Sequence, residues 1–552
     1  MKVLLIPSAV LMPREMRKSF GDLPTCLFPL GGADMLTMLC RKYKNAVDRI
    51  YVIAYERHEW IERYIKMKKL PVQMICLDHL ENLGYTIEYG MDVILQEVSE
   101  IEYLYINFAD SFLEDILPSA SNDFIYYAEQ DMDASWTWFR EDNGHIIDVF
   151  DKGDFKEEKI PDKSFKKLFV GVFGISDVQD FTEQLHQAAR NTTVDSFYGA
   201  LWAYSQKHHF DFLESFSWFD VGHNENYIKA KTKVAARAFN SIKIDEERGI
   251  LTKTSENKEK LINEIRWYLR MPSSLQYLIP RIYDYSLDFL SPYVSMEYYG
   301  YHTLHESLVY GKLSLGEWKN IFKKLLFSIQ DMQTFRISGR KQEIEAAVYE
   351  MYLDKTRQRL EKLRNKKEFT DFFNHKIFIN GVEYNSLDEI LAILPYYVKK
   401  ILVNSAYSNF TIIHGDLCFT NILVEDNYNF MRIIDPRGKF GTFDIYGDSR
   451  YELAKILHSL EGHYDYIIED MFDVEVQDTH ISYHLQLGEQ TALQAFQQVF
   501  EKQLTDIQAI RLIEATLFLS MIPLHNDYLS RQYAMLATGI TLFDEVVKGG
   551  VL

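Results

Sequence analysis

The stretch that decides the fold is TIIHGDLCFTNILVEDNYNFMRIIDPRG, residues 411–438. Its first apolar run ends in a His-Gly-Asp triplet that closes at Asp416, and its last apolar run ends in Asp435. Asn421 follows five residues after Asp416. Short apolar runs bounded by turn-forming residues are typical of buried strands. We therefore expect strand ends that bring three oxygen-bearing side chains together.

These three side chains suit phosphoryl transfer from a nucleotide to an alcohol. The reaction needs a carboxylate that orients and deprotonates the acceptor hydroxyl, and Asp416 is the candidate. It also needs oxygen ligands for Mg2+. Asn421 and Asp435 would suffice, because Mg2+ keeps water and phosphate as its other ligands. The alternative is a hairpin in which these residues only form turns, as Asp, Asn and Gly often do.

The order of these residues is similar to the H-R-D-x-x-x-x-N and D-F-G elements of protein kinases. Gly415 replaces the arginine, and Asp435 is followed by Pro436 and Arg437. Both departures are found in the aminoglycoside phosphotransferase and choline kinase superfamily, so this part of the chain resembles small-molecule kinases. The resemblance covers residues 236–552. It implies a bilobal protein-kinase-like fold, with an N-lobe to about residue 300, that uses ATP as co-substrate and Mg2+.

The same resemblance requires a lysine on a strand and a glutamate on the next helix. The pattern of residues 239–255 predicts two strands, with Lys253 near the end of the second. Residues 256–270 have a helical apolar stripe with Glu264 beside it. A pair between Lys253 and Glu264 would hold the lysine against the nucleotide phosphates. The alternative is that both are solvated surface charges, as most such residues are.

The segment YVSMEYYGYHT, residues 293–303, resembles the connection between the two kinase lobes. Backbone groups around Glu297 and Tyr298 would meet the nucleotide base there. No G-x-G-x-x-G array lies between the two strands that precede it, where residues 246–249 are Glu-Glu-Arg-Gly. Cover for the phosphates would come from a short turn or from elsewhere in the chain.

Beyond this segment, Asp448 has two interpretations. It would contact a polar acceptor, or it would cap the helix that is predicted to begin near Arg450, and capping is the favoured alternative. The final hundred residues are predicted to be packed helices.

The first 235 residues have a different pattern. Apolar strands are predicted at residues 2–6, 49–54, 72–77 and 103–108, with helical periods between them. Alternating strands and helices predict a parallel sheet with ligands at the carboxyl ends of its strands. The last of these strands is followed by Asp110. A chain of 552 residues is therefore expected to hold at least two domains, 1–235 and 236–552.

This first part resembles the sugar-phosphate nucleotidyltransferases, which have a Rossmann-like fold and join a nucleoside monophosphate to a phosphorylated sugar or alcohol. Four places carry the resemblance: LPTCLFPLGG at 23–32, Asp110, FDKG at 150–153 and WFDVGHNENY at 218–227. The resemblance implies Mg2+ between Asp110 and Asp220, where the ion would neutralise charge on the α-phosphate, and Lys152 on the acceptor phosphate. The plainer interpretations are a helix N-cap for Asp110, a turn for Asp220 and a solvated position for Lys152.

The nucleotide loop of that resemblance is altered. The family's glycine-rich loop is replaced by PSAVLMPREMR at residues 7–17, and the lysine of its Pro-Lys motif corresponds to Thr25. Glycine-rich loops work because bare backbone N–H groups approach phosphate closely, which Val, Leu and Met side chains hinder. Arg14, Arg17 and Lys18 are the candidates to replace the missing charge.

Composition narrows the class of partners. The net charge is -20, from 60 Lys and Arg against 80 Asp and Glu, which argues against binding to nucleic acid or to anionic membranes. Four cysteines without a C-x-x-C pair indicate a reducing compartment, so a cytoplasmic location is expected. No uninterrupted apolar run approaches the roughly 20 residues of a membrane span. The oligomeric state stays open.

Three hypotheses follow for the whole chain. The first is a bifunctional enzyme that phosphorylates a small alcohol or sugar with ATP and activates the product with CTP or UTP, as in capsule or lipopolysaccharide synthesis by resemblance. The second keeps the kinase and makes the first domain a noncatalytic binding module. The third is a nucleotide-binding pseudoenzyme scaffold. The 36 Tyr and 36 Phe residues keep choline and ethanolamine among the acceptors, because aromatic rings can enclose such cations.

Overall fold

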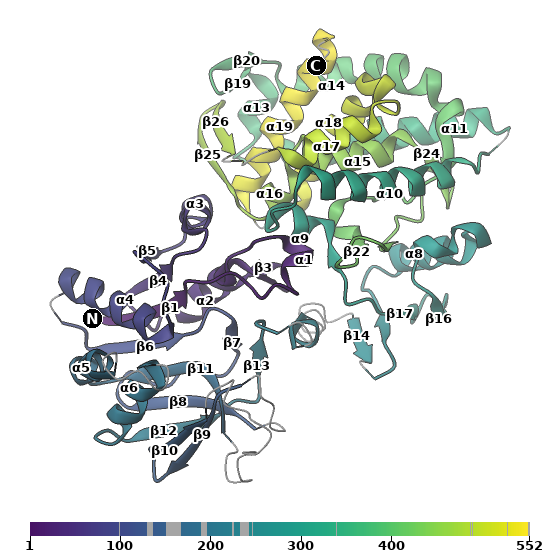
Figure 1. Cartoon of the computed structure of the whole chain (residues 1–552). Helices are drawn as coiled ribbons and strands as arrows, with labels where there is room; N and C mark the ends of the chain where they lie inside the picture. Colours follow the sequence, from purple (N-terminus) through teal and green to yellow (C-terminus); the bar gives the residue numbers. More distant parts are fainter. Residues whose placement is uncertain are drawn as a thin grey trace. The chain divides into compact units, whose positions relative to one another are not determined.

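The computed structural model describes residues 1–98, 100–129, 136–150, 167–188, 196–223, 226–231, 242–245, 247–337, 339–485, 487, 490–526 and 528–549. The chain divides into two compact units, Met1–Ala235 and Ala236–Leu552. Figure 1 labels the elements of each unit along the sequence.

The first unit is built on a mixed sheet with the strand order β10-β9-β11-β6-β1-β4-β5, in which β8 pairs with β11 and β12 with β8. Its strands are β1 Lys2–Ser8, β4 Arg49–Ala54, β5 Val72–Cys76, β6 Tyr103–Asn107, β8 Asp123–Ala128, β9 Trp138–Asp142, β10 His145–Phe150, β11 Lys167–Ile175 and β12 Phe210–Glu214. Strands β6, β1, β4 and β5 are parallel. The prediction of a mixed α/β unit with a parallel sheet is confirmed.

Helices cover this sheet, which explains its apolar strands. Val3, Leu4, Leu5 and Ile6 on β1 are fully buried, as expected for a parallel strand that is covered on both faces. The helices of the unit are α1 Arg17–Phe20, α2 Met35–Tyr43, α3 His58–Lys68, α4 Leu83–Glu97, α5 Val178–Ala188 and α6 Ser196–Ser205. A smaller antiparallel pair joins β7, Ser111–Leu113, to β13, Trp218–Asp220.

The second unit begins with an antiparallel sheet in the order β14-β15-β17-β16. Its strands are β14 Ile242–Asp245, β15 Ile250–Lys253, β16 Ile282–Ser286 and β17 Tyr293–Glu297. Helix α8, Lys258–Arg270, follows β15, and the 3-10 turn η2, Ser273–Leu278, follows α8. The Asn257 side chain caps α8 by accepting from the Lys260 N–H. Buried apolar residues of α8 such as Ile265 and Trp267 join the core of the unit.

The remainder of the second unit is largely helical (Figure 1). Its helices are α9 Leu304–Val309, α10 Leu315–Gln333, α11 Lys341–Tyr349, α12 Lys355–Arg364, α13 Thr370–Asn374, α14 Leu387–Tyr397, α15 Arg450–Leu460, α16 Tyr464–Ile468, α17 Thr491–Phe500, α18 Ile507–Met521 and α19 Leu529–Lys548. The predicted strand region contains β21 Phe410–Ile412, β22 Ile422–Val424 and β23 Met431–Ile433, while β24 is Tyr446–Asp448.

The prediction that the final hundred residues are helical is wrong in one place. Strands β25, Phe472–Gln477, and β26, His480–Leu485, form an antiparallel hairpin. Strand β19, Ile377–Ile379, extends this sheet beside β26 and pairs with β20, Val382–Tyr384. The partner strand comes from about a hundred residues earlier, so local periodicity gives no indication of it.

One helical stretch among the described residues, Leu504–Leu524, is long and apolar enough to cross a membrane by length and composition alone. Its apolar window is 78% buried inside the protein, as in a core helix. Arg511 and Glu514 lie within it, so the stretch is not an uninterrupted apolar run.

All four cysteines are free. Cys26, Cys40 and Cys418 are buried, whereas Cys76 at the end of β5 is exposed. Burial is the main cause that raises the pKa of each buried thiol to about 12.

Candidate functional site

An ion-paired lysine lies at the centre of the second unit. Lys253 ends β15, and its ammonium Nζ lies 2.9 and 3.0 Å from the two carboxylate oxygens of Glu264 on α8. The same Nζ lies 2.7 Å from Oδ1 of Asp435, which follows β23. The structure thus brings together three residues that the sequence patterns single out, across 182 positions of chain. Glu264 is 2% exposed, so the solvated-surface alternative is wrong for this residue.

Burial and the two carboxylates set the protonation of this cluster. Burial raises the pKa of Glu264 to about 7, with a further contribution from the charge of Asp435. Burial lowers the pKa of Lys253, but Asp435 and Glu264 outweigh it and leave this pKa raised. Lys253 therefore remains a cation in the interior of the site.

Asp416 and Asn421 lie in the loop between β21 and β22. The side-chain amide of Asn421 donates to the Asp416 carbonyl oxygen at 2.9 Å. The Ile434 N–H donates to the Asn421 carbonyl oxygen at 3.0 Å. These bonds hold Asn421 beside the residue that precedes Asp435. The side-chain oxygen of Asn421 and the Asp435 carboxylate are the ligands that would hold Mg2+ here. Oxygen ligands of this kind fit that ion.

Three side chains outside the set of predicted site residues support this loop. Lys455 on α15 places Nζ 2.8 Å from Oδ1 of Asp416. Glu452, one turn earlier on α15, accepts the N–H groups of His414 and Gly415 at 3.1 and 2.9 Å. Their spacing of three on α15 puts both on one helical face, which is the only indication in the sequence that could have found them.

Arg437 is the third of these residues. Its Nε donates to the Gly415 carbonyl oxygen at 3.0 Å and its Nη2 donates to the Tyr451 hydroxyl at 3.0 Å. Gly415 has a φ of +75°, a left-handed conformation that favours glycine. Burial raises the pKa of Asp416, but Lys455 and then Arg437 outweigh it and hold this pKa well below its usual range.

The backbone at Asp435 is held in an uncommon conformation. Its φ is +58°, in the left-handed region that few non-glycine residues adopt. Its N–H donates to the hydroxyl of Tyr268, a fully buried residue of α8, at 3.1 Å. The Asp435 side chain is nevertheless 47% exposed, so its carboxylate can reach a ligand in solvent.

The predicted base contacts differ in detail from the structure. The Glu297 N–H donates to the Arg281 carbonyl oxygen and the Tyr298 N–H donates to the Gly249 carbonyl oxygen, both at 2.8 Å. These two N–H groups are therefore already used within the protein, and the prediction that backbone groups around Glu297 and Tyr298 meet the base then concerns the other backbone groups of this segment. Other backbone groups of the segment after β17 would have to meet a base.

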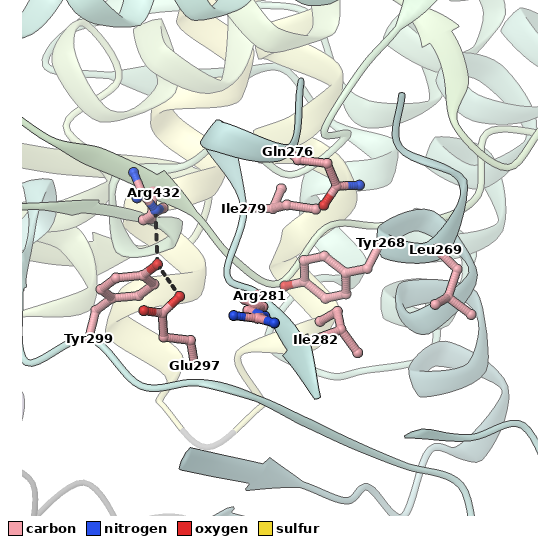
Figure 2. Close-up of a pocket in the computed structure, with 9 residues that line it drawn as sticks. All are labelled: Tyr268, Leu269, Gln276, Ile279, Arg281, Ile282, Glu297, Tyr299 and Arg432. Atoms are coloured by element: carbon pink, nitrogen blue, oxygen red, sulfur yellow. Dashed lines mark hydrogen bonds between the residues drawn. The ribbon is translucent and has the colours of Figure 1, made fainter. Parts of the chain in front are cut away.

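A cavity of about 390 Å³ lies beside this segment, bordered by the end of α8, η2, β16 and β23. Figure 2 shows its polar side, where the Tyr299 hydroxyl donates to Glu297 at 2.6 Å and Arg432 Nε donates to the Tyr299 oxygen at 3.1 Å. Strand β17 lies between β15 and β16. Glu297 and Tyr299, which border the cavity, belong to the segment predicted to meet the base, and Tyr268, which also borders it, accepts the Asp435 N–H.

Asp448 takes the structural role. It is fully buried, its carboxylate accepts from Arg450 Nε and Nη2 at 2.9 and 2.8 Å, and it also accepts the Arg450 N–H at 3.1 Å. Ser449 is the residue at the helix boundary. The N-cap position is therefore Ser449 and not the predicted Asp448, which supports the start of α15 from one position earlier.

Two acidic residues converge in the first unit. Asp220 ends β13 and pairs with Ser111 of β7, and the Val221 N–H donates to the Asp110 carbonyl oxygen at 2.9 Å. A Cβ atom built on Gly222 would lie 2.8 Å from Asp110 Oδ2 and 3.2 Å from Asp220 Oδ1. The helix-cap alternative for Asp110 is wrong, because strand β7 follows it. Two converging carboxylates fit a divalent cation.

Hydrogen bonds also hold Asp220 in place. Its carboxylate accepts from the Gly222 N–H at 2.9 Å and from the Asn226 amide at 3.0 Å, and its Oδ2 lies 2.9 Å from His223 Nδ1. Lys152, the predicted acceptor contact, lies outside the described residues. No group of three or more His, Cys, Asp or Glu side chains is placed to hold a metal ion in the parts of the chain that the structure describes.

In the altered loop of the first unit, backbone N–H groups already donate to other groups of the protein. The Leu11 N–H donates to Glu56 Oε2 at 2.9 Å, and the Met12 N–H donates to the Leu23 carbonyl oxygen at 3.2 Å. Arg17 Nε donates to the Met12 carbonyl oxygen at 2.6 Å, whereas Arg14 is exposed. In this conformation the loop does not offer these N–H groups to a phosphate.

Comparisons with known proteins give structural matches only. No family model and no curated protein matches the chain. Similar solved structures include CTP:phosphocholine cytidylyltransferase LicC from Streptococcus pneumoniae, with 13% identity over 42% of this chain and 97% of that one and a TM-score of 0.33. UDP-glucose pyrophosphorylase with UDP-glucose has 14% identity over 43% and 99%, with a TM-score of 0.34. HddC from Yersinia pseudotuberculosis has 17% identity over 42% and 99%, with a TM-score of 0.32.

Proposed function

We propose that the second unit is an ATP-dependent kinase that phosphorylates an alcohol group of a small molecule. The observation that carries this proposal is the contact of Lys253 with both Glu264 and Asp435. A buried cation between a helical carboxylate and a carboxylate after a strand is the arrangement that phosphoryl transfer uses to bind nucleotide phosphates.

The remaining residues then have defined roles. Lys253 would bind phosphate oxygens while Glu264 orients it, and Asn421 and Asp435 would hold Mg2+, which neutralises charge on the phosphates when bound. The acceptor hydroxyl oxygen forms a bond to the γ-phosphorus as the bond to ADP breaks. Its proton goes to Asp416. Since the pKa of Asp416 is lowered, this carboxylate is a weak base that orients the hydroxyl and takes the proton late.

The test is consumption of ATP with Mg2+ and a panel of sugars and alcohols, followed by phosphorus NMR. Asp416→Asn should abolish the phosphomonoester product while the protein keeps a cooperative thermal unfolding transition. Asp478→Asn is the matched control, because Asp478 is exposed in a turn with a φ of +53° that asparagine also adopts. Product formation by Asp416→Asn at the wild-type rate would refute the proposal.

For the first unit we propose a nucleotidyltransferase-like role toward CTP or UTP, and the observation that favours it is the convergence of Asp110 and Asp220 at Gly222. The whole chain would then be bifunctional, and by resemblance it would act in the cytoplasm in the synthesis of capsule or lipopolysaccharide precursors. Pyrophosphate released from CTP or UTP with the kinase product, and lost in Asp220→Asn, would support turnover. Absence of pyrophosphate with every nucleotide would leave the alternative of a noncatalytic binding module, which the occupied donors of Leu11 and Met12 favour.

A further inference from the structure

Four basic side chains lie near one another in the second unit, Lys455, Arg437, Lys355 and Arg359, and the first two act directly on Asp416. Lys455 pairs with Asp416 directly at 2.8 Å. Lys355 at the start of α12 and Arg437 both contact the sulfur of Met351, with Nζ at 3.9 Å and Nη1 at 3.6 Å. Because they meet the same sulfur atom, these two cations lie close enough together to share one bound anion.

The cations of this cluster outnumber its anions. Arg437 donates to a carbonyl oxygen, a tyrosine hydroxyl and the sulfur, and Arg359 on α12 donates to the Ser520 carbonyl oxygen at 3.1 Å. Lys355 contacts only the sulfur. None of these three cations forms an ion pair with a carboxylate in the part of the chain that the structure describes. Asp416 is already paired with Lys455 and also attracts Arg437, so four basic side chains face two carboxylates, Asp416 and Glu452, and positive groups are in excess.

Glu452 and Tyr451, which also act on Arg437, make other contacts as well. Glu452 accepts the N–H groups of the catalytic loop. The ring of Tyr451 is covered by the Arg437 guanidinium, whose carbon lies 5.4 Å from the ring centroid. That ring face is therefore not available to enclose a quaternary ammonium group.

The protonation of Lys355 agrees with this picture. Burial lowers its pKa well below the usual range, and the charges of Arg437, Arg359 and Lys455 lower it further. A bound anion would favour the charged form of this lysine and accept its N–H groups.

We propose that the acceptor of the phosphoryl group is itself an anion, a small alcohol or sugar that carries a phosphate or carboxylate group held by Lys355, Arg359 and Arg437. This inference rests on the proposed kinase function. It excludes choline, ethanolamine and aminoglycosides as substrates, because their cationic groups would be repelled by three cations without carboxylate partners. The product would carry both the original anionic group and the new phosphomonoester.

The first test measures binding without turnover, with inorganic phosphate as the probe. At constant ionic strength, phosphate should raise the thermal midpoint of the wild type. Lys355→Met should weaken phosphate binding about tenfold, the effect of losing one charge-assisted hydrogen bond. Lys362→Met is the matched control, because Lys362 is exposed on the same helix α12, and it should bind phosphate like the wild type. Unchanged phosphate binding in Lys355→Met and in the second variant Arg359→Gln would overturn the proposal.

The second test separates the acceptor from the γ-phosphate of ATP. Neutral sugars and alcohols are compared with their phosphorylated or carboxylated counterparts, and kcat/KM should be higher for the anionic member of each pair. In Lys355→Met this preference should fall about tenfold while the KM for ATP stays unchanged. A raised KM for ATP, or efficient phosphorylation of choline or ethanolamine, would overturn the proposal.

If the second unit is not a kinase, both tests give a different pair of results. In that case no acceptor of either charge would be phosphorylated, yet binding of inorganic phosphate would still depend on Lys355. That result would remove the proposed function and the acceptor role, and would leave an anion site. Alternatively, the kinase is active and depends on Asp416 while phosphate binding and the preference for anionic acceptors do not depend on Lys355. That result would refute only the proposal of an anionic acceptor.

Discussion

At the scale of single residues, Lys253 connects the two halves of the candidate nucleotide site. Its ammonium contacts Asp435 Oδ1 at 2.7 Å, an oxygen that a magnesium nucleotide would also require. Under the proposed kinase function, binding of that nucleotide would replace this contact, and the lysine would turn to the phosphates while Glu264 holds its position. The Lys253–Asp435 ion pair seen in the structure would thus compete with the nucleotide for both side chains.

Replacing Lys253 with methionine should leave Glu264 buried without its cation. Loss of one partner of a buried pair costs about 3–5 kcal/mol. Burial already raises the pKa of Glu264, so the folded variant favours the protonated acid. Its stability is then greatest at low pH and is lost as pH rises through the folded-state pKa.

Thermal midpoints should be measured between pH 5.5 and pH 8.5, a range that includes the pKa of about 7 of Glu264. The midpoint of Lys253→Met should fall further below that of the wild type as pH rises. The double variant Lys253→Met with Glu264→Gln should remove this pH dependence, because the glutamine is neutral throughout. A deficit that is independent of pH would contradict the assignment.

Under the proposed kinase function, Lys455 would act through Asp416 as a positioning residue, because the two form an ion pair. Asp416 faces Lys455, Arg437 and His414, and the first two hold its pKa well below the usual range. Asp416 therefore stays ionised in the wild type at neutral and mildly acidic pH. In Lys455→Met its pKa rises, and activity should be lost as pH falls through the new value.

The measurement is the pH profile of kcat/KM with Mg2+ and ATP. Its acid limb should move to higher pH in Lys455→Met and return toward the wild-type position in Lys455→Arg, which keeps the charge. A rate that falls equally at every pH would indicate lost packing and would refute the electrostatic role.

At the scale of elements, helix α8 lies against the segment that follows Asp435. A Cβ atom on Gly438 would lie 2.1 Å from the Asn263 carbonyl oxygen, and Gly438 has a φ of +65°. Asn263 directly precedes Glu264 on α8. The absence of a side chain at Gly438 therefore lets the helix approach closely enough for Glu264 to reach Lys253.

Gly438→Ala should push α8 away and separate Glu264 from Lys253. Gly249→Ala is the matched control, because Gly249 has a φ of +63° but a Cβ atom added there would meet nothing within 4 Å. Both variants place an alanine in the left-handed backbone conformation, which lowers the stability by about 1–2 kcal/mol. Gly438→Ala should lose more stability than this and should also raise the KM for ATP, as measured by thermal midpoint and steady-state kinetics. Equal effects of both substitutions would contradict the close approach.

Much of this arrangement follows from local patterns in the sequence. Apolar runs bounded by turn residues predict β1 and β4, and the apolar stripe of α8 predicts that helix together with the place of Glu264. The roles of Lys455 and Lys355 could not be predicted, because charged residues on amphipathic helices are usually solvated. Only the tertiary fold brings α12 and α15 to Asp416. The hairpin β25–β26 could not be predicted for a similar reason, since its partner β19 lies far away in the chain.

At the scale of the whole molecule, each unit has a hydrophobic core of its own. One cluster of buried apolar residues runs from Val3 to Phe210, and another runs from Leu261 to Val546. Such cores support separate cooperative units. The chain is therefore expected to respond to its ligands one unit at a time.

Calorimetry of the full chain should show two unfolding transitions. Mg2+ with ATP should raise one of them, by about 2.7 kcal/mol at a hundred times the Kd, and leave the other unchanged. Asp435→Asn should reduce this shift, because it weakens the metal site of the second unit alone. A single transition that every ligand moves would contradict two independent cores.

The distribution of thiols in the fold has a practical consequence for such studies. Maleimide reagents react with thiolates, and the pKa of about 12 for Cys26, Cys40 and Cys418 keeps these buried groups unreactive near neutral pH. Cys76 is the exposed thiol. The natural chain should therefore take up one fluorophore without any engineered cysteine. That fluorophore would report on the first unit while substrates of the second are added.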